Sequence, residues 1–127
     1  MPFPLLFRRL LTFGRRSEIL AIDYLRSLGY RIVISPYRTK TGEVDVIAWD
    51  GGVLVFIEVK ARRTSEPPED SVGFRKQKRI IRAAQGYISR YRLHETSYRF
   101  DILAVTVLPH SKPQFRLLRD AFTTSLD

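Results

Sequence analysis

Two stretches of the chain space their apolar residues every three or four positions, which is typical of amphipathic helices. The first predicted helix covers residues 17–28, is closed by Gly29, and carries Ala21, Tyr24, Leu25 and Leu28 on one face. The second covers residues 75–92, and its apolar stripe consists of Ile80, Ile81, Ala84, Tyr87, Ile88 and Tyr91. We therefore expect two helices that each pack one face against a core.

Five stretches around these helices are rich in β-forming residues, at 30–35, 43–49, 53–59, 99–108 and 114–118. Asp50-Gly51-Gly52 joins the second and third as a hairpin, because glycine supplies the positive φ of a tight turn. Residues 53–57 are apolar on both faces, which indicates a strand in the middle of a sheet. The order α-β-β-β-α-β-β predicts an α/β fold with a mixed central sheet flanked by helices.

The length of 127 residues matches a single domain. We expect an apolar and basic arm at 1–14, one domain at 15–122 with a loop at 62–73, and a tail at 123–127. Arg8 and Arg9 shorten the first apolar run well below a signal peptide or a membrane span. The chain has no cysteine, which excludes disulfides and thiolate zinc sites. We therefore expect a cytoplasmic protein that is not associated with a membrane.

Two carboxylates are expected to meet where the buried strand ends. Strand alternation places Glu58 and Lys60 on one face of the sheet and Val59 on the other. Asp45, on the preceding strand, shares the face of Glu58 whether the hairpin loop has two or four residues. The pattern therefore predicts that Asp45, Glu58 and Lys60 lie together.

A pair of neighbouring carboxylates is costly unless a cation lies between them. At about 4 Å they repel by roughly 4 kcal/mol if the effective dielectric constant is about 20. A divalent cation removes this repulsion, and ligands that are all oxygen favour Mg²⁺ or Mn²⁺. The alternative is a simple ion pair of Lys60 with Glu58 or Asp45 at the rim of the sheet.

The second predicted helix carries one amide within its apolar stripe. Gln77 lies at the centre of that stripe, one turn inside the start of the helix. Because a buried amide needs hydrogen-bond partners, Gln77 is expected to reach a buried acidic or phosphate-binding site. The alternative is that it bonds the loop preceding the helix.

The other side of this helix is strongly basic. It carries five cations and no acid, namely Arg75, Lys78, Arg79, Arg82 and Arg90. The whole chain has a net charge of +9. Such an excess favours a polyanionic partner, nucleic acid before a membrane surface. The alternative is a solvated face that keeps the protein soluble.

Glu18 is an acidic residue of the first helix, and its projection falls between Leu25 and Ile22. Its side chain either points along the sheet toward Asp45 and Glu58 or interacts with the N-terminal end of the helix dipole. His94 and His110 have no partners that would make a triad or a zinc site, and we expect both on the surface.

The set Glu18, Asp45, Glu58-Val59-Lys60 and Gln77, in this order, resembles the PD-(D/E)xK nuclease superfamily. The acid on the first helix is similar to that of archaeal Holliday-junction resolvases. More closely, the chain resembles the YraN family of uncharacterised bacterial proteins over roughly residues 14–122. The matching stretches include Gly42-Glu43-Val44-Asp45, Val55-Phe56-Ile57-Glu58-Val59-Lys60, Lys76-Gln77 and Arg99-Phe100-Asp101. Val44 replaces the proline of the superfamily name, Ser17 a usual glycine, and Ser35-Pro36 a usual asparagine, and none of these changes removes a catalytic group.

The resemblance implies a restriction endonuclease-like fold and metal-dependent hydrolysis of phosphodiester bonds, in DNA rather than RNA and including branched or junction DNA. It implies that Asp45, Glu58, the Val59 carbonyl and Glu18 hold Mg²⁺ or Mn²⁺. Lys60 would then orient the attacking water or stabilise negative charge, and Gln77 would position water or phosphate. The five cations of the basic helix would follow the nucleic-acid backbone.

Two other functions fit the same residues. One is a non-catalytic nucleic-acid-binding or adaptor module on this fold, and the other is a protein-interaction domain whose basic face meets an acidic partner. The presence of Asp45, Glu58 and Lys60 together favours the enzyme. Resolvases pair as dimers, so a homodimer is compatible with the sequence, although no stretch of it requires one.

Overall fold

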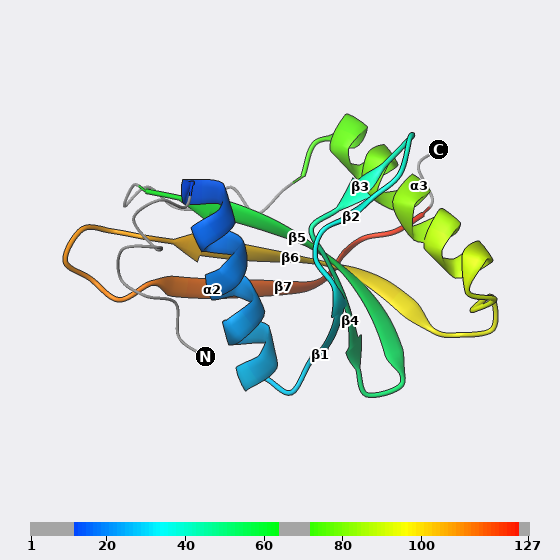
Figure 1. Ribbon diagram of the computed structural model, residues 1–127, viewed down its shortest axis with the longest axis horizontal. Coiled ribbons are helices and arrows are strands. Elements are labelled where there is room, and N and C mark those ends of the chain that lie inside the picture. The colour runs from blue at the N-terminus through cyan, green and yellow to red at the C-terminus, as the bar shows by residue number, and fades with distance from the viewer. Residues whose placement is uncertain (1–11, 64–71, 125–127) are drawn as a thin grey trace.

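The computed structural model describes residues 12–63 and 72–124 of the chain. Its elements, in chain order, are α2 (Phe13–Ser27), β1 (Arg31–Ile34), β2 (Tyr37–Arg38), β3 (Glu43–Val44), β4 (Val46–Asp50), β5 (Val53–Arg62), α3 (Phe74–Arg90), β6 (Tyr98–Thr106) and β7 (Gln114–Phe122) (Figure 1). The predicted α/β class is confirmed.

The central sheet has five strands in the order β1-β4-β5-β6-β7. Strands β5 and β6 are parallel and are connected through α3, whereas the other neighbouring pairs are antiparallel. The hairpin between β4 and β5 pairs Asp50 with Val53, so its loop is Gly51-Gly52, and Gly51 has a φ of +59°. The sheet is therefore mixed, as predicted, and the tight hairpin fixes the register on which the site depends.

Helices α2 and α3 cover opposite faces of the sheet. Helix α2 packs Ala21 and Leu25 against one face, and Gly29 ends it with a φ of +93°. The amide of Gly29 donates to the carbonyl of Arg26 and that of Tyr30 donates to the carbonyl of Leu25, which is the hydrogen-bond pattern of a Schellman motif. Helix α3 covers the other face with Ile80, Ile81, Ala83, Ala84, Tyr87 and Ile88.

A short antiparallel pair, β2 and β3, was not predicted and lies against α3 (Figure 1). Its close approach to the helix depends on Gly42. A Cβ atom at this position would lie 2.8 Å from the Ala83 nitrogen and would clash with the carbonyl oxygen of Arg79. Glycine therefore lets the pair approach the helix backbone, and this approach fixes the chain just before Asp45.

Several boundaries differ from those predicted. Helix α2 begins at Phe13 rather than at residue 17, because Thr12 caps it by accepting a hydrogen bond from the amide of Arg15. Strands β5 and β7 extend to Arg62 and Phe122. The strand predicted at 43–49 is interrupted at Asp45.

Parts of the predicted arm at 1–14, loop at 62–73 and tail at 123–127 lie outside the described residues, which begin at 12, omit 64–71 and end at 124. Within the described ranges, none of the helices combines the length and the apolar character needed to cross a membrane.

Candidate active site

Asp45 and Glu58 lie side by side on the α3 face of the sheet. The register pairs Val46 with Ile57, which brings Asp45 opposite Glu58. Both residues are buried, with 8% and 7% of their surfaces exposed. The Asp45 Oδ2 accepts a hydrogen bond of 2.8 Å from the backbone amide of Val59. The structure therefore brings together the two carboxylates that strand alternation predicted.

The backbone at Asp45 is held outside the regular ladder. Asp45 lies in the break between β3 and β4, and its carbonyl accepts a 2.7 Å hydrogen bond from the Ser35 hydroxyl. This break frees the Asp45 side chain to reach the amide of Val59 across the hairpin. The sequence gives no signal that Ser35 holds the Asp45 carbonyl, because this hydrogen bond joins two separate segments of the chain. In the sequence Ser35 differs from the family pattern only as a substitution.

Glu58 is the less satisfied member of the pair. Its Oε1 forms an ion pair of 3.4 Å with the Lys76 ammonium, while its buried Oε2 has no hydrogen-bond partner in the part of the chain that the structure describes. Burial and the negative charge of Asp45 raise the pKa of Glu58 to about 8, although Lys76 opposes the increase. A proton, a cation or another donor would therefore stabilise this carboxylate.

Lys76 is a residue of the site that was not predicted from the sequence. It lies in the first turn of α3, one residue before Gln77, and its side chain is 38% exposed. In projection it falls about 100° from Gln77, at the edge of the apolar stripe, and that position is the signal that could have identified it.

Gln77 forms the hydrogen bond that was the alternative interpretation of its position. Its Nε2 donates a 2.7 Å hydrogen bond to the carbonyl of Val72, in the segment preceding α3. The side chain is half-buried and bonds the segment before the helix. Lys60 is also half-buried and lies two residues beyond Glu58 on β5.

Glu18 is not brought to the carboxylate pair. Its Oε2 forms an ion pair of 2.9 Å with Arg15, one turn earlier on α2. Among residues 12–63 and 72–124, no three acidic, histidine or cysteine side chains gather closely enough to hold a metal ion. Because α2 begins at Phe13, its first turn contains no acid, and Glu18 lies beyond the turn in which the helix dipole acts. Its ion pair is local, with Arg15, so neither predicted position of Glu18 is found.

The predicted basic face of α3 is exposed along its length. Arg75, Lys78, Arg79, Arg82 and Arg90 all have exposed side chains. Arg79 lies 3.8 Å from Glu43, and the Lys78 ammonium lies 4.6 Å from the centre of the Phe74 ring. His94 and His110 are exposed, as expected.

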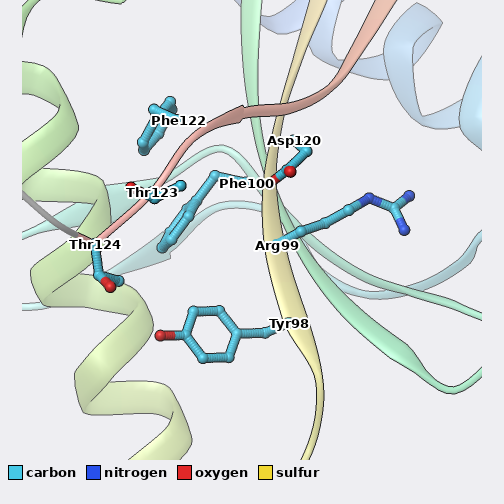
Figure 2. A pocket seen from close by; sticks show the side chains of 7 residues that line it. All are labelled: Tyr98, Arg99, Phe100, Asp120, Phe122, Thr123 and Thr124. Atoms are coloured by element: carbon cyan, nitrogen blue, oxygen red, sulfur yellow. The ribbon is translucent and has the colours of Figure 1, made fainter.

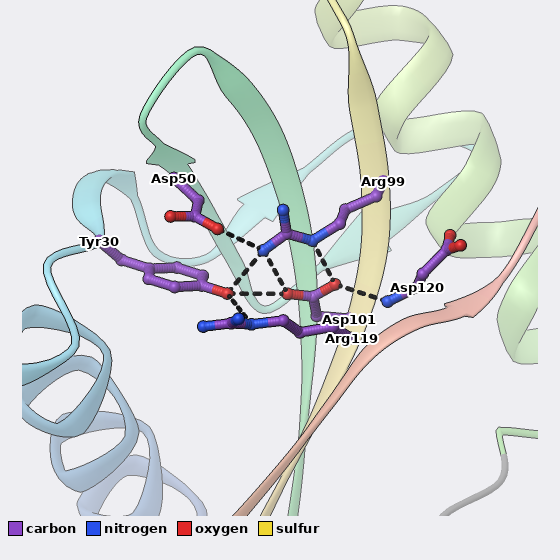
Figure 3. Close-up of polar contacts among 6 residues, drawn as sticks. All are labelled: Tyr30, Asp50, Arg99, Asp101, Arg119 and Asp120. Atoms are coloured by element: carbon purple, nitrogen blue, oxygen red, sulfur yellow. Dashed lines mark hydrogen bonds and ion pairs between the residues drawn. The ribbon is translucent and has the colours of Figure 1, made fainter.

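A second cluster of charges surrounds Asp101, which is fully buried on β6 (Figure 3). Arg99 donates to Asp101 at 3.0 and 3.3 Å and to Asp50 at 2.8 Å. The Tyr30 hydroxyl accepts from Arg99 at 2.7 Å and from Arg119 at 3.2 Å, and it donates to Asp101 at 3.2 Å. The sequence identifies Arg99-Phe100-Asp101 only as a stretch that matches the family pattern. The signal for this cluster is a pair of opposite charges, Arg99 and Asp101, on one face of an otherwise apolar strand.

Two cavities lie away from the carboxylate pair. One, of about 140 Å³, is lined by Tyr98, Arg99, Phe100, Asp120, Phe122, Thr123 and Thr124 (Figure 2). Phe100 is the lining residue of β6 that is nearest to the pair, and it lies beside Phe56, two positions before Glu58, so this cavity begins roughly 7 Å along the strands from Glu58. The other, of about 230 Å³, is lined by Phe13, Arg16, Arg63, Val107, Leu108 and Pro109.

Comparison with known proteins identifies the family. The model of the uncharacterised protein family UPF0102 matches residues 17–105. A UPF0102 protein of Chlorobium limicola is 45% identical over 96 residues, which cover 74% of each chain. A UPF0102 protein of Geotalea uraniireducens is 39% identical over 113 residues, covering 87% of this chain and 89% of the relative. The matched residues span Asp45, Glu58, Lys60 and Lys76. The chain therefore belongs to the UPF0102 family, which is the YraN family that its motifs resemble.

Proposed function

We propose that this protein is a metal-dependent endonuclease that hydrolyses phosphodiester bonds in DNA, including branched or junction DNA. The observation that carries the proposal is the Asp45–Glu58 pair, in which two buried carboxylates are neighbours and one Glu58 oxygen has no hydrogen-bond partner among the described residues. A structural ion pair would leave neither the repulsion nor the unpartnered oxygen.

The residues of this pair suit a divalent cation. They offer carboxylate oxygens, which favour Mg²⁺ or Mn²⁺ over softer metals. Asp45 and Glu58 would hold the ion, with the backbone carbonyl of Val59 as a further ligand. Once bound, such an ion lowers the pKa of a coordinated water and neutralises charge on a phosphate.

The remaining roles fall to side chains around the pair. Lys60, two residues beyond Glu58, would orient the attacking water or stabilise the developing negative charge. The α3 face, with five exposed cations, would bind successive phosphates of the backbone. Gln77 would contribute by holding the segment before α3 through Val72, which keeps the start of the basic helix in place.

The test is a cleavage assay on labelled duplex, flap, junction and single-stranded DNA in Mg²⁺ and in Mn²⁺, together with the same structures in RNA. The wild-type protein should cut at least one substrate. Lys60→Ala should abolish cleavage and leave Mn²⁺ binding largely intact, because lysine is not a metal ligand. Asp45→Asn and Glu58→Gln should lose both, because each removes a charged oxygen ligand.

Matched controls separate these effects from a change in net charge. Asp23→Asn removes one negative charge from an exposed position on α2, and Lys112→Ala removes one positive charge from an exposed loop. Both variants should cleave like the wild type. Wild-type protein that binds no Mn²⁺ and cuts nothing would contradict the proposal.

A non-catalytic nucleic-acid-binding module is the second candidate, and two observations favour it. Lys76 already supplies a positive charge to Glu58, and Glu18 is paired with Arg15 instead of adding a third carboxylate. On this alternative, Asp45→Asn, Glu58→Gln and Lys60→Ala would bind nucleic acid like the wild type and differ from it in stability alone.

A further inference from the structure

Lys76 occupies a position that normally disfavours a cation. It lies in the first turn of α3, which contains no acid and in which Gly73 provides no side-chain cap. The N-terminal end of a helix carries a partial positive charge and therefore repels lysine. The interaction that compensates Lys76 is its ion pair of 3.4 Å with Oε1 of Glu58.

The two partners of this ion pair differ in their freedom to move. The Glu58 side chain is only 10% exposed and projects from a strand with neighbours on both sides, whereas the Lys76 side chain is 38% exposed at the start of a helix. Lys76 can therefore turn its ammonium group into water without burying a charge. The buried Glu58 side chain cannot turn into water in this way, so its carboxylate stays in the site and remains able to bind a cation.

We propose that Lys76 is a built-in counter-ion that competes with the divalent cation for Glu58 and so sets the metal affinity of the site. This inference rests on the proposed function. A cation that binds Asp45 and Glu58 has to displace the Lys76 ammonium, because two positive groups at the same carboxylate repel each other. The lysine thus keeps the affinity low, and the site fills above a threshold concentration of metal.

The experiment is a calorimetric Mn²⁺ titration of the full chain and of three variants at position 76. Lys76→Met removes the competitor and should lower the dissociation constant about tenfold, since the opposing charge lay within a few ångströms. Lys76→Glu replaces the competitor with a third carboxylate and should lower it about a hundredfold. Lys76→Arg retains the positive charge and should bind Mn²⁺ about as weakly as the wild type.

Lys78 provides the matched control. It lies two residues further along α3, about 200° around the helix from Lys76, and its ammonium lies over the exposed ring of Phe74. Lys78→Met and Lys78→Glu change the net charge by the same amounts as the Lys76 variants and should leave the dissociation constant within about twofold, because an exposed charge on another side of the helix is screened by salt. Urea unfolding of every variant would show that differences in metal affinity do not arise from unfolding.

The outcomes distinguish this inference from the proposed function. Tighter binding by Lys76→Met and Lys76→Glu, without a change in the Lys78 variants, supports it. If the wild type binds Mn²⁺ and Lys76→Met and Lys76→Glu bind it no more tightly, Lys76 does not compete with the cation, but the proposal of a metal site at Asp45 and Glu58 is retained. If neither the wild type nor Lys76→Glu binds Mn²⁺, both proposals are overturned.

Discussion

Two buried carboxylate clusters of this protein are built in opposite ways. Around Asp101, each of the two carboxylate oxygens accepts hydrogen bonds, from Arg99, Tyr30 and the backbone amide of Asp120 (Figure 3). At the other cluster, Asp45 and Glu58 face each other, and Glu58 keeps one buried oxygen without a partner in the described part of the chain. One cluster satisfies its charges internally and the other does not.

The pKa shifts follow this difference. Burial by itself lowers the pKa of the Arg99 guanidinium, but its hydrogen bonds to Asp101 and Asp50 raise the pKa above its ordinary value. The charged form of Arg99 is therefore stabilised where it lies. At Glu58 burial and Asp45 both raise the pKa, so the charged form is destabilised. A cluster whose charges are all hydrogen-bonded contributes to the fold, whereas one that keeps a buried carboxylate oxygen without a partner is a candidate site for binding a cation.

The largest change in the free energy of unfolding is expected for mutations in the Asp101 cluster. Asp101→Ala would leave the mostly buried Arg99 without its main partner, and breaking a buried ion pair costs about 3–5 kcal/mol. Urea unfolding would measure this loss. Asp50→Ala removes another partner of the same Arg99, but its side chain is 35% exposed, so its loss should be at most about 1 kcal/mol. If Asp101→Ala and Asp50→Ala lost the same free energy of unfolding, the buried Asp101 would not be the residue that stabilises Arg99.

At the Asp45–Glu58 pair, a mutation is expected to increase the stability of the protein instead of decreasing it. Glu58 has its pKa raised from 4.5 to about 8 on folding. Between these values the unfolded chain releases the proton that the folded chain keeps. The free energy of unfolding therefore falls as the pH rises, and the destabilisation caused by the charged Glu58 is complete above pH 8. Glu58→Gln should therefore be more stable than the wild type at pH 8, by about 1–3 kcal/mol, with little difference at pH 4. A destabilised Glu58→Gln at pH 8 without metal would show that the pair is a structural one.

A smaller effect extends the comparison to the basic face of α3. If Arg75, Arg79 and Arg82 each neutralise a phosphate, replacing all three with alanine should lower the slope of log affinity against log salt by about 0.9 for each phosphate that is no longer neutralised. Fluorescence anisotropy with a labelled duplex would measure it. Alanine at Arg26, Arg31 and Lys112 removes the same charge from exposed positions outside α3 and should change the slope less. An equal change would indicate that total charge, rather than this face, determines binding.

The smallest effect is expected at Glu18. Because its described partner is Arg15 at a partly exposed position, Glu18→Gln should cost less than about 1 kcal/mol. Its Mn²⁺ dissociation constant should stay within about twofold of the wild-type value. A large loss of metal affinity would place Glu18 in the site, as the resemblance to resolvases implies, and would require α2 to move in the metal-bound protein.

Much of the fold and part of the site could be predicted because they depend on local periodicity. Alternation along β5 fixes the face on which Glu58 lies, and the Gly51-Gly52 turn fixes the register that brings Asp45 beside it. The same periodicity distinguished the apolar and basic sides of α3. These features follow from residues close together in the chain, so the sequence by itself determined the carboxylate pair and the class of fold.

Tertiary structure decided the partners of these residues. Lys76 and Glu58 are 18 positions apart, and which cation reaches the carboxylate depends on how α3 packs onto the sheet. The approach of Gly42 to the backbone of α3 and the bond from Ser35 to Asp45 likewise join separate elements. Alternation and helical projection give the direction of a side chain but not the distance to another element. The sequence therefore determined where the carboxylates point, and packing decided that one of them pairs with Lys76 through a single oxygen.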